Sequence, residues 1–125
     1  MRVLLTGAGG FVGHHTLSHL LKTTDYHFIV TDSFRHRGNS ARLRSVFEEV
    51  KSAKDRVKVV THDLTTPIDL VTSRELGDVQ VLISMASESH VDRSIEEPRN
   101  FIENNTNLIL TLLDFSRQLD NLELF

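Results

Sequence analysis

Three glycines near the start of the chain, Gly7, Gly10 and Gly13, stand three residues apart behind a short apolar run. Between a strand and a helix, the first glycine would permit a tight turn and the second would let a pyrophosphate approach the backbone. The third would let the helix pack closely on the sheet. The N–H groups and the dipole at the start of such a helix attract phosphate. The spacing therefore predicts a phosphate-binding loop.

An acidic residue follows at the distance that a dinucleotide site requires. Asp32 ends the run of residues 28–32 and comes 19 residues after Gly13. A carboxylate there can accept hydrogen bonds from both hydroxyls of an adenosine ribose and would repel a 2′-phosphate, which favours NAD over NADP. Arg35 and Arg37 oppose the second inference, because a nearby arginine can bind that phosphate. We predict a dinucleotide site with a preference for NAD.

The composition gives little support to other kinds of chemistry. His15 and His19 have a spacing that metal ligands on a helix can have, but no third ligand accompanies them, so we predict no metal site. A formal charge of -3 at pH 7 argues against a nucleic-acid partner. No apolar run approaches the roughly 18 residues of a membrane span, and the chain has no cysteine. We expect a cytoplasmic protein without membrane or disulfide chemistry.

Short apolar runs alternate with helical patterns along the chain. The runs at residues 3–5, 28–30, 57–60 and 79–83 are nearly continuous, as in strands covered on both faces. The apolar helix faces between and after them are Val12, Leu17, Leu20 and Leu21, then Leu43, Val46, Phe47 and Val50, and finally Phe101, Leu108, Leu112 and Phe115. A weaker helix over residues 68–76 would end at Gly77, and the last helix would begin near Pro98. The alternation predicts an α/β fold with a doubly wound parallel sheet, the Rossmann arrangement.

The last residues predict one more strand. Residues 121–125 have the character of the beginning of a fifth strand, at which the sequence stops. We therefore expect residues 1–125 to form a dinucleotide-binding domain of a longer protein whose substrate domain is absent here.

Two stretches carry a resemblance to a known family. Residues 82–95, LISMASESHVDRSI, together with the glycine motif of residues 6–13, resemble the extended short-chain dehydrogenase/reductase family, also called the NAD-dependent epimerase/dehydratase family. Within it, the chain is most similar to the nucleotide-sugar 4,6-dehydratases, above all to those that act on dTDP-glucose. The resemblance covers essentially the whole chain, and residues 88–94 are more specific to the dehydratases than the glycine motif is.

The resemblance implies a cofactor site for NAD. Backbone contacts to the pyrophosphate would come from Phe11 and Val12, and Asp32 would hold the adenosine ribose. The other implied contacts are Ser33, Phe34, Arg35 and Gly38 around the adenosine, Asp63 and Leu64 at the adenine, Met85, Ala86 and Ser87 at the nicotinamide end, and Asn104 where the family usually has a threonine. Ser89 would lie where a nucleotide-sugar substrate meets the nicotinamide. The family also implies a homodimer through the helix that begins near Pro98.

The catalytic pair of the family has no counterpart in this sequence. The family's chemistry needs a tyrosine followed four residues later by a lysine. Tyr26 is the only tyrosine, and Val30 stands four residues after it, so we assign no catalytic residue and expect the chain alone to be inactive. Ser84 and Met85, where the family usually has histidine and leucine, leave the sugar open. The alternatives are a fragment of a nucleotide-sugar 4-epimerase or decarboxylase, and a non-catalytic dinucleotide-binding module.

Overall fold

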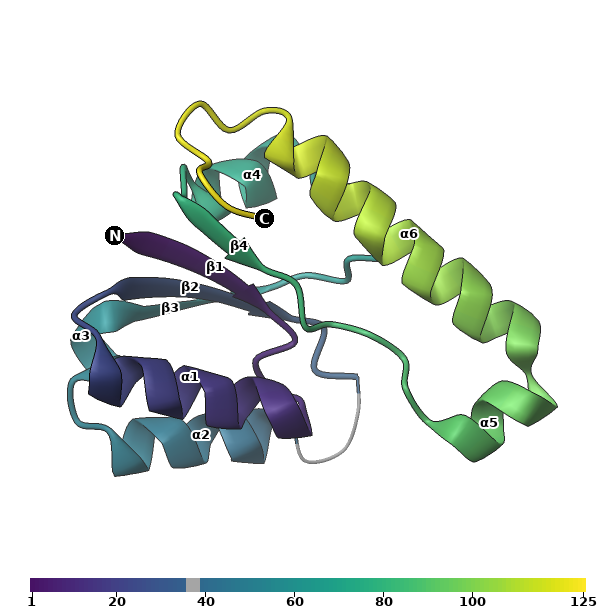
Figure 1. Ribbon diagram of the computed structural model, residues 1–125, viewed down its shortest axis with the longest axis horizontal. Helices are drawn as coiled ribbons and strands as arrows, with labels where there is room; N and C mark the ends of the chain where they lie inside the picture. Colours follow the sequence, from purple (N-terminus) through teal and green to yellow (C-terminus); the bar gives the residue numbers. More distant parts are fainter. Residues whose placement is uncertain (36–38) are drawn as a thin grey trace.

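A four-stranded parallel sheet forms the centre of the computed structural model, which describes residues 1–35 and 39–125 (Figure 1). The strands are β1 (Arg2–Thr6), β2 (His27–Asp32), β3 (Val57–Thr61) and β4 (Val81–Ile83), in the spatial order β3-β2-β1-β4. β1 pairs with β2 on one side and with β4 on the other. The chain therefore reverses its direction of travel across the sheet between β3 and β4.

Helices cover both faces of this sheet. The helices α1 (Phe11–Thr23), α2 (Asn39–Glu49) and α3 (Ala53–Arg56) lie on one face, and α4 (Leu70–Leu76) and α6 (Pro98–Ser116) lie on the other (Figure 1). The short helix α5 (Val91–Glu96) leads into α6 at the end that projects beyond the sheet. This three-layer arrangement is the doubly wound α/β fold of the Rossmann type.

Alternate residues of each strand supply two separate cores. Val3 and Leu5 of β1 face α1 and α2, whereas Leu4 faces α4 and α6. The first core is completed by side chains such as Leu17 and Phe28, and the second includes Phe115, with all of these side chains almost fully buried. Because both faces are covered, the strands read as nearly continuous apolar runs in the sequence.

The ends of three helices follow from local sequence. Pro98 occupies the first turn of α6, where its missing N–H is not needed. Gly77 follows α4 with a φ of 67°, in the left-handed region that favours glycine. The carboxylate of Asp69 accepts a hydrogen bond from the backbone N–H of Thr72 at 2.7 Å, which caps the start of α4. By contrast, α1 follows Gly10 without a side-chain cap and has no acidic residue in its first turn.

Most of the expected elements are confirmed, with two differences. Neither α3 nor α5 was predicted, because four and six residues are too short to show a helical period. The prediction that Val12 belongs to the buried face of the first helix is wrong, since Val12 is 61% exposed. The last residues, which were predicted as the beginning of a fifth strand, make one parallel bridge between Leu124 and Val81 of β4. Among residues 1–35 and 39–125, no helix has the length and apolar character to cross a membrane.

Candidate functional site

A cleft of about 440 Å³ opens at the carboxyl ends of the strands. Its walls come from the loops that follow all four strands and from residues of α1, α2, α5 and α6. The loops after β1 and β4 leave neighbouring strands toward opposite faces of the sheet, so the backbone itself creates the opening. Open α/β sheets bind ligands at such a reversal point.

The glycine loop forms the floor of the cleft between β1 and α1. Gly7 has a φ of 66°, and a Cβ there would lie 2.7 Å from the backbone nitrogen of Ala86. A Cβ on Gly13 would lie 2.1 Å from the carbonyl oxygen of Gly7, so any side chain would push α1 away from the loop. Both positions thus need glycine for backbone reasons. The loop brings the uncapped start of α1, at Gly10 and Phe11, to the edge of the cleft.

Asp32 lies at the end of β2, and hydrogen bonds from neighbouring residues fix its carboxylate. Its Oδ2 accepts a hydrogen bond from the N–H of Gly9 at 3.0 Å, and its Oδ1 accepts one from the N–H of Phe34 at 2.8 Å. A third bond reaches Oδ1 from Nδ2 of Asn39 at 3.3 Å. Asp32 is only 8% exposed, yet it lines the cleft. Its negative charge is therefore fixed in position where the glycine loop meets the second strand.

An ion pair closes one side of the cleft. Nη1 of Arg35 lies 3.2 Å from Oδ2 of Asp63, which follows β3. Oδ1 of Asp63 accepts hydrogen bonds from both the N–H and the hydroxyl of Thr65. Burial raises the pKa of Asp63, but the two bonds from Thr65 and the guanidinium of Arg35 outweigh it and hold this pKa below its usual range. Asp63 is therefore a charged acceptor on the wall.

Two polar side chains fix the loop that follows β4. The Oγ1 of Thr6, fully buried on β1, accepts hydrogen bonds from the N–H groups of Met85 and Ala86 at 3.0 and 3.1 Å. The amide of Asn105 on α6 accepts from the N–H of Glu88 at 2.8 Å and donates to its carbonyl at 3.0 Å. Residues 85–88 are thereby held from two sides, with residues 85–90 lining the cleft.

Most of the residues predicted from the sequence come together here. The cleft is lined by Gly7, Gly10, Phe11, Asp32, Ser33, Arg35, Asp63, Leu64, Met85, Ala86, Ser87, Ser89 and Asn104. Gly13 lies buried behind the glycine loop, and Val12 is exposed but is not part of the cleft lining. Phe34, with a φ of 52°, turns instead toward the core under α2, where it borders a separate apolar hollow with Leu43 and Phe47. Gly38, like Arg37, lies outside the described residues.

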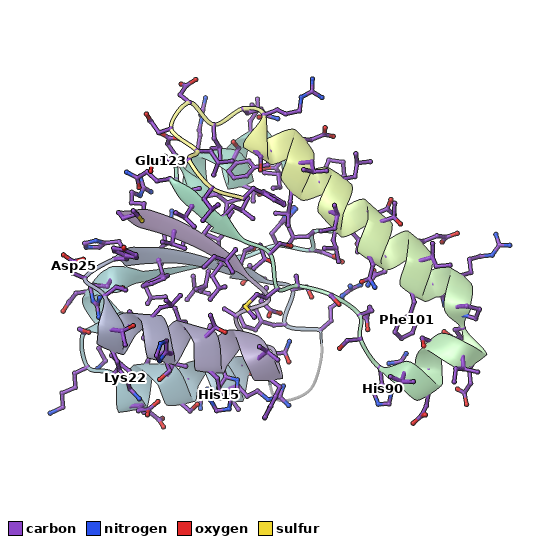
Figure 2. All side chains as sticks on the ribbon, viewed as in Figure 1. His15, Lys22, Asp25, His90, Phe101 and Glu123 are labelled. Atoms are coloured by element: carbon purple, nitrogen blue, oxygen red, sulfur yellow. The ribbon has the colours of Figure 1, made fainter. Side chains whose placement is uncertain are left out.

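Several residues of the site were not foreseen. Thr6, Gly9, Asn39 and Asn105 hold the residues that line the cleft through hydrogen bonds across the fold. His90 and Arg93, from the start of α5, add basic groups to the rim of the cleft next to the loop that follows β4. Figure 2 shows His90 at that corner, with Phe101 pointing from α6 toward the same loop. The asparagine-rich stretch of α6 was a sequence signal for Asn105, but Asn39 had none.

Histidines on α1 form a small aromatic group at the rim. The ring centroids of His14 and His15 lie 4.0 Å apart, and that of Phe11 lies 5.2 Å from His15. Nδ1 of His14 is bound to the carbonyl of Gly10 at 2.8 Å. Within the part of the chain that the structure describes, no group of three His, Cys, Asp or Glu residues is placed to hold a metal ion.

This combination of fold and cleft has counterparts among known proteins. Residues 4–124 match the GDP-mannose 4,6 dehydratase family, and the chain belongs to that family.

Two of its relatives are dTDP-glucose 4,6-dehydratases. The enzyme of Salmonella typhimurium is 30% identical over 118 residues, which are 94% of this chain and 31% of that protein. The solved structure of DesIV from Streptomyces venezuelae, a double mutant with NAD bound, is 35% identical and has a TM-score of 0.79; the match covers 94% of this chain and 36% of that one.

A solved epimerase is also similar. The UDP-glucuronic acid 4-epimerase of Bacillus cereus, a mutant solved in complex with NAD, is 26% identical with a TM-score of 0.75, over 99% of this chain and 38% of that one. The chain thus spans about a third of the length of the relatives that it matches.

Proposed function

We propose that this chain is the NAD-binding part of a nucleotide-sugar 4,6-dehydratase that acts on dTDP-glucose. The observation that carries the proposal is the cleft itself, where an uncapped helix start and a fixed carboxylate face one another across a loop that has no room for side chains at Gly7 and Gly13. Phosphate fits the first group and ribose hydroxyls fit the second.

The cofactor would lie across the carboxyl ends of β1 and β4, where the loops leave the two strands toward opposite faces of the sheet. Its pyrophosphate would bind the backbone at Gly10, Phe11 and Val12, and its adenosine ribose would bind Asp32. The remaining contacts would be Ser33, Arg35, Asp63 and Leu64 with the adenosine, and Met85, Ala86, Ser87 and Asn104 with the nicotinamide end. Ser89, on the rim, would meet the sugar. NAD supplies a hydride acceptor, and the residues named here bind and orient it.

The dehydratase assignment rests on the relatives. The dTDP-glucose 4,6-dehydratase structure is 35% identical to this chain, whereas the epimerase structure is 26% identical. A 4-epimerase, a decarboxylase or a non-catalytic module would use the same cleft. The full-length protein incubated with dTDP-glucose should give a 4-keto-6-deoxy sugar nucleotide. A 4-epimer would favour the epimerase, and no product from any nucleotide sugar would favour the non-catalytic module. A decarboxylase would instead release carbon dioxide from a nucleotide sugar that carries a carboxylate.

The chain by itself should show no turnover. A base is needed to take the proton of the sugar hydroxyl as hydride leaves, and without one a factor of roughly 10²–10⁴ is lost. Tyr26, the only tyrosine, precedes β2 and has Val30 rather than a lysine four residues later. Product formed by the isolated chain above a no-protein control would contradict this expectation.

Calorimetric titration of the chain with NAD tests the binding proposal. We expect the folded protein to bind NAD, and Asp32→Ala to weaken binding strongly. Asp25→Ala is the matched control, because Asp25 is exposed at the opposite end of β2 from the cleft (Figure 2). A folded wild-type chain that binds no NAD would overturn the proposal, as would equal losses in the two variants.

We further propose a homodimer through α6. Ile102, Ile109, Leu110 and Leu113 are exposed on this helix, and an apolar surface of this kind is a common feature of interfaces. Light scattering of the full-length protein and of an Ile109→Glu variant would test the interface. A cytoplasmic location stays a prediction from the cysteine-free composition.

A further inference from the structure

Asn39, the first residue of α2, connects three parts of the cleft. It is only 7% exposed, and its Nδ2 donates to Oδ1 of Asp32 at 3.3 Å. Its Oδ1 accepts a hydrogen bond from Nη1 of Arg42, one turn further along α2, at 3.1 Å. Its Cβ also lies 2.8 Å from where a Cβ of Gly9 would stand, so α2 begins directly against the glycine loop.

The chemistry of the amide explains why it sits between these two charges. The NH₂ group can only donate and the carbonyl oxygen can only accept. The observed orientation therefore satisfies the Asp32 carboxylate and the Arg42 guanidinium together, whereas a flipped amide would oppose both. Within the described chain, Asp32 and Arg42 make no direct ion pair. Asn39 separates them while binding each.

Arg42 is the group that could reverse the selectivity of the cleft. Its half-buried side chain lines the cleft together with Asp32 and Ser33. A guanidinium binds phosphate through several N–H groups, and beside the adenosine ribose it would favour a 2′-phosphate. If it paired with Asp32, it would also cancel the charge that repels such a phosphate.

We propose that Asn39 is a positioning residue that sets the preference for NAD over NADP. It holds the Asp32 carboxylate toward the ribose and restrains the Arg42 guanidinium with its own carbonyl. This inference rests on the proposed function, namely that the cleft binds a nicotinamide dinucleotide. It goes further by tying the choice between the two dinucleotides to a residue that the sequence did not single out.

The test compares dissociation constants for NAD and NADP, measured by calorimetry on the chain. We expect wild type to prefer NAD, and Asn39→Ala to lower the ratio of the NADP constant to the NAD constant by about tenfold, as expected for a lost hydrogen bond to a charged group. Adding Arg42→Gln to Asn39→Ala should weaken NADP again. Asn100→Ala, the same substitution at an exposed position at the start of α6, should leave the ratio unchanged.

Each outcome separates this inference from the proposed function. Equal weakening of NAD and NADP in Asn39→Ala would make Asn39 merely structural and overturn the inference, with dinucleotide binding intact. Wild-type preference for NADP would overturn it as well. A folded wild-type chain that binds neither dinucleotide would overturn the proposed function. Thermal melting checks that each variant is folded, and Asn39→Ser, which retains a short polar group at the helix start, replaces Asn39→Ala if the latter is not.

Discussion

The two hydrogen bonds between the side chain of Asn105 and the backbone of Glu88 predict how much a substitution of Asn105 lowers the free energy of unfolding. Asn105→Ala removes both bonds, at 2.8 and 3.0 Å, while the bonds to Thr6 at the other end of the loop after β4 remain. At about 1 kcal/mol for each neutral hydrogen bond, the loss is about 2 kcal/mol. Because water can reach the half-buried pair and replace the lost partners, the lower limit of the loss in free energy of unfolding is about 1 kcal/mol.

Asn107→Ala is the matched control for this experiment. Asn107 lies on the same helix two residues later, is exposed, and makes no hydrogen bond to the loop after β4 within the part of the chain that the structure describes. Replacing asparagine by alanine raises helix propensity by up to about 0.7 kcal/mol at either position. The difference in free energy of unfolding between the two variants therefore isolates the pair of bonds.

Urea unfolding followed by far-ultraviolet circular dichroism measures that difference, because the chain has no tryptophan to serve as a fluorescent probe. We expect Asn105→Ala to unfold at a lower urea concentration than Asn107→Ala, and to bind NAD more weakly because residues 85–88 are no longer held. Equal midpoints for the two variants would refute the reasoning that Asn105 stabilises the loop.

Three further predictions follow from single contacts. Gly10→Val should fold, since Gly10 has an ordinary extended backbone, but should abolish NAD binding by placing a branched side chain at the start of α1; unchanged affinity in calorimetry would contradict it. Asp69→Ala should lower the urea midpoint through loss of the α4 cap, and an unchanged midpoint would show that the cap contributes nothing. The lowered pKa of Asp63 means that its contribution to stability is present above the unfolded-state pKa of about 3.9 and is lost as the pH falls through the folded-state pKa. Urea midpoints at pH 6 and pH 3 should therefore differ less in Asp63→Asn than in wild type, and identical differences would count against this role.

The sequence alone determined the elements and the general kind of site. The local signals are the nearly continuous apolar runs, the helical periods between them, Pro98 and Gly77 at helix ends, and the spacing of Gly7 and Gly13. Each reflects the steric and hydrogen-bonding demands of a few consecutive residues, so it can be read without knowing the fold. Asp32 was found in this way, by its distance from the glycines and its place at the end of a strand.

Only the tertiary structure decided how the site is held together. The bonds from Gly9 to Asp32 and from Glu88 to Asn105, and the tie from Thr6 to the β4 loop, join residues that are 23, 17 and about 80 positions apart. No pattern in the sequence predicts such bonds, because their partners come together only when the strands pair in the order β3-β2-β1-β4. For the same reason the side chain of Phe34, expected at the adenosine by resemblance, packs against the core under α2, while the N–H of Phe34 and the amide of Asn39 both donate to Asp32.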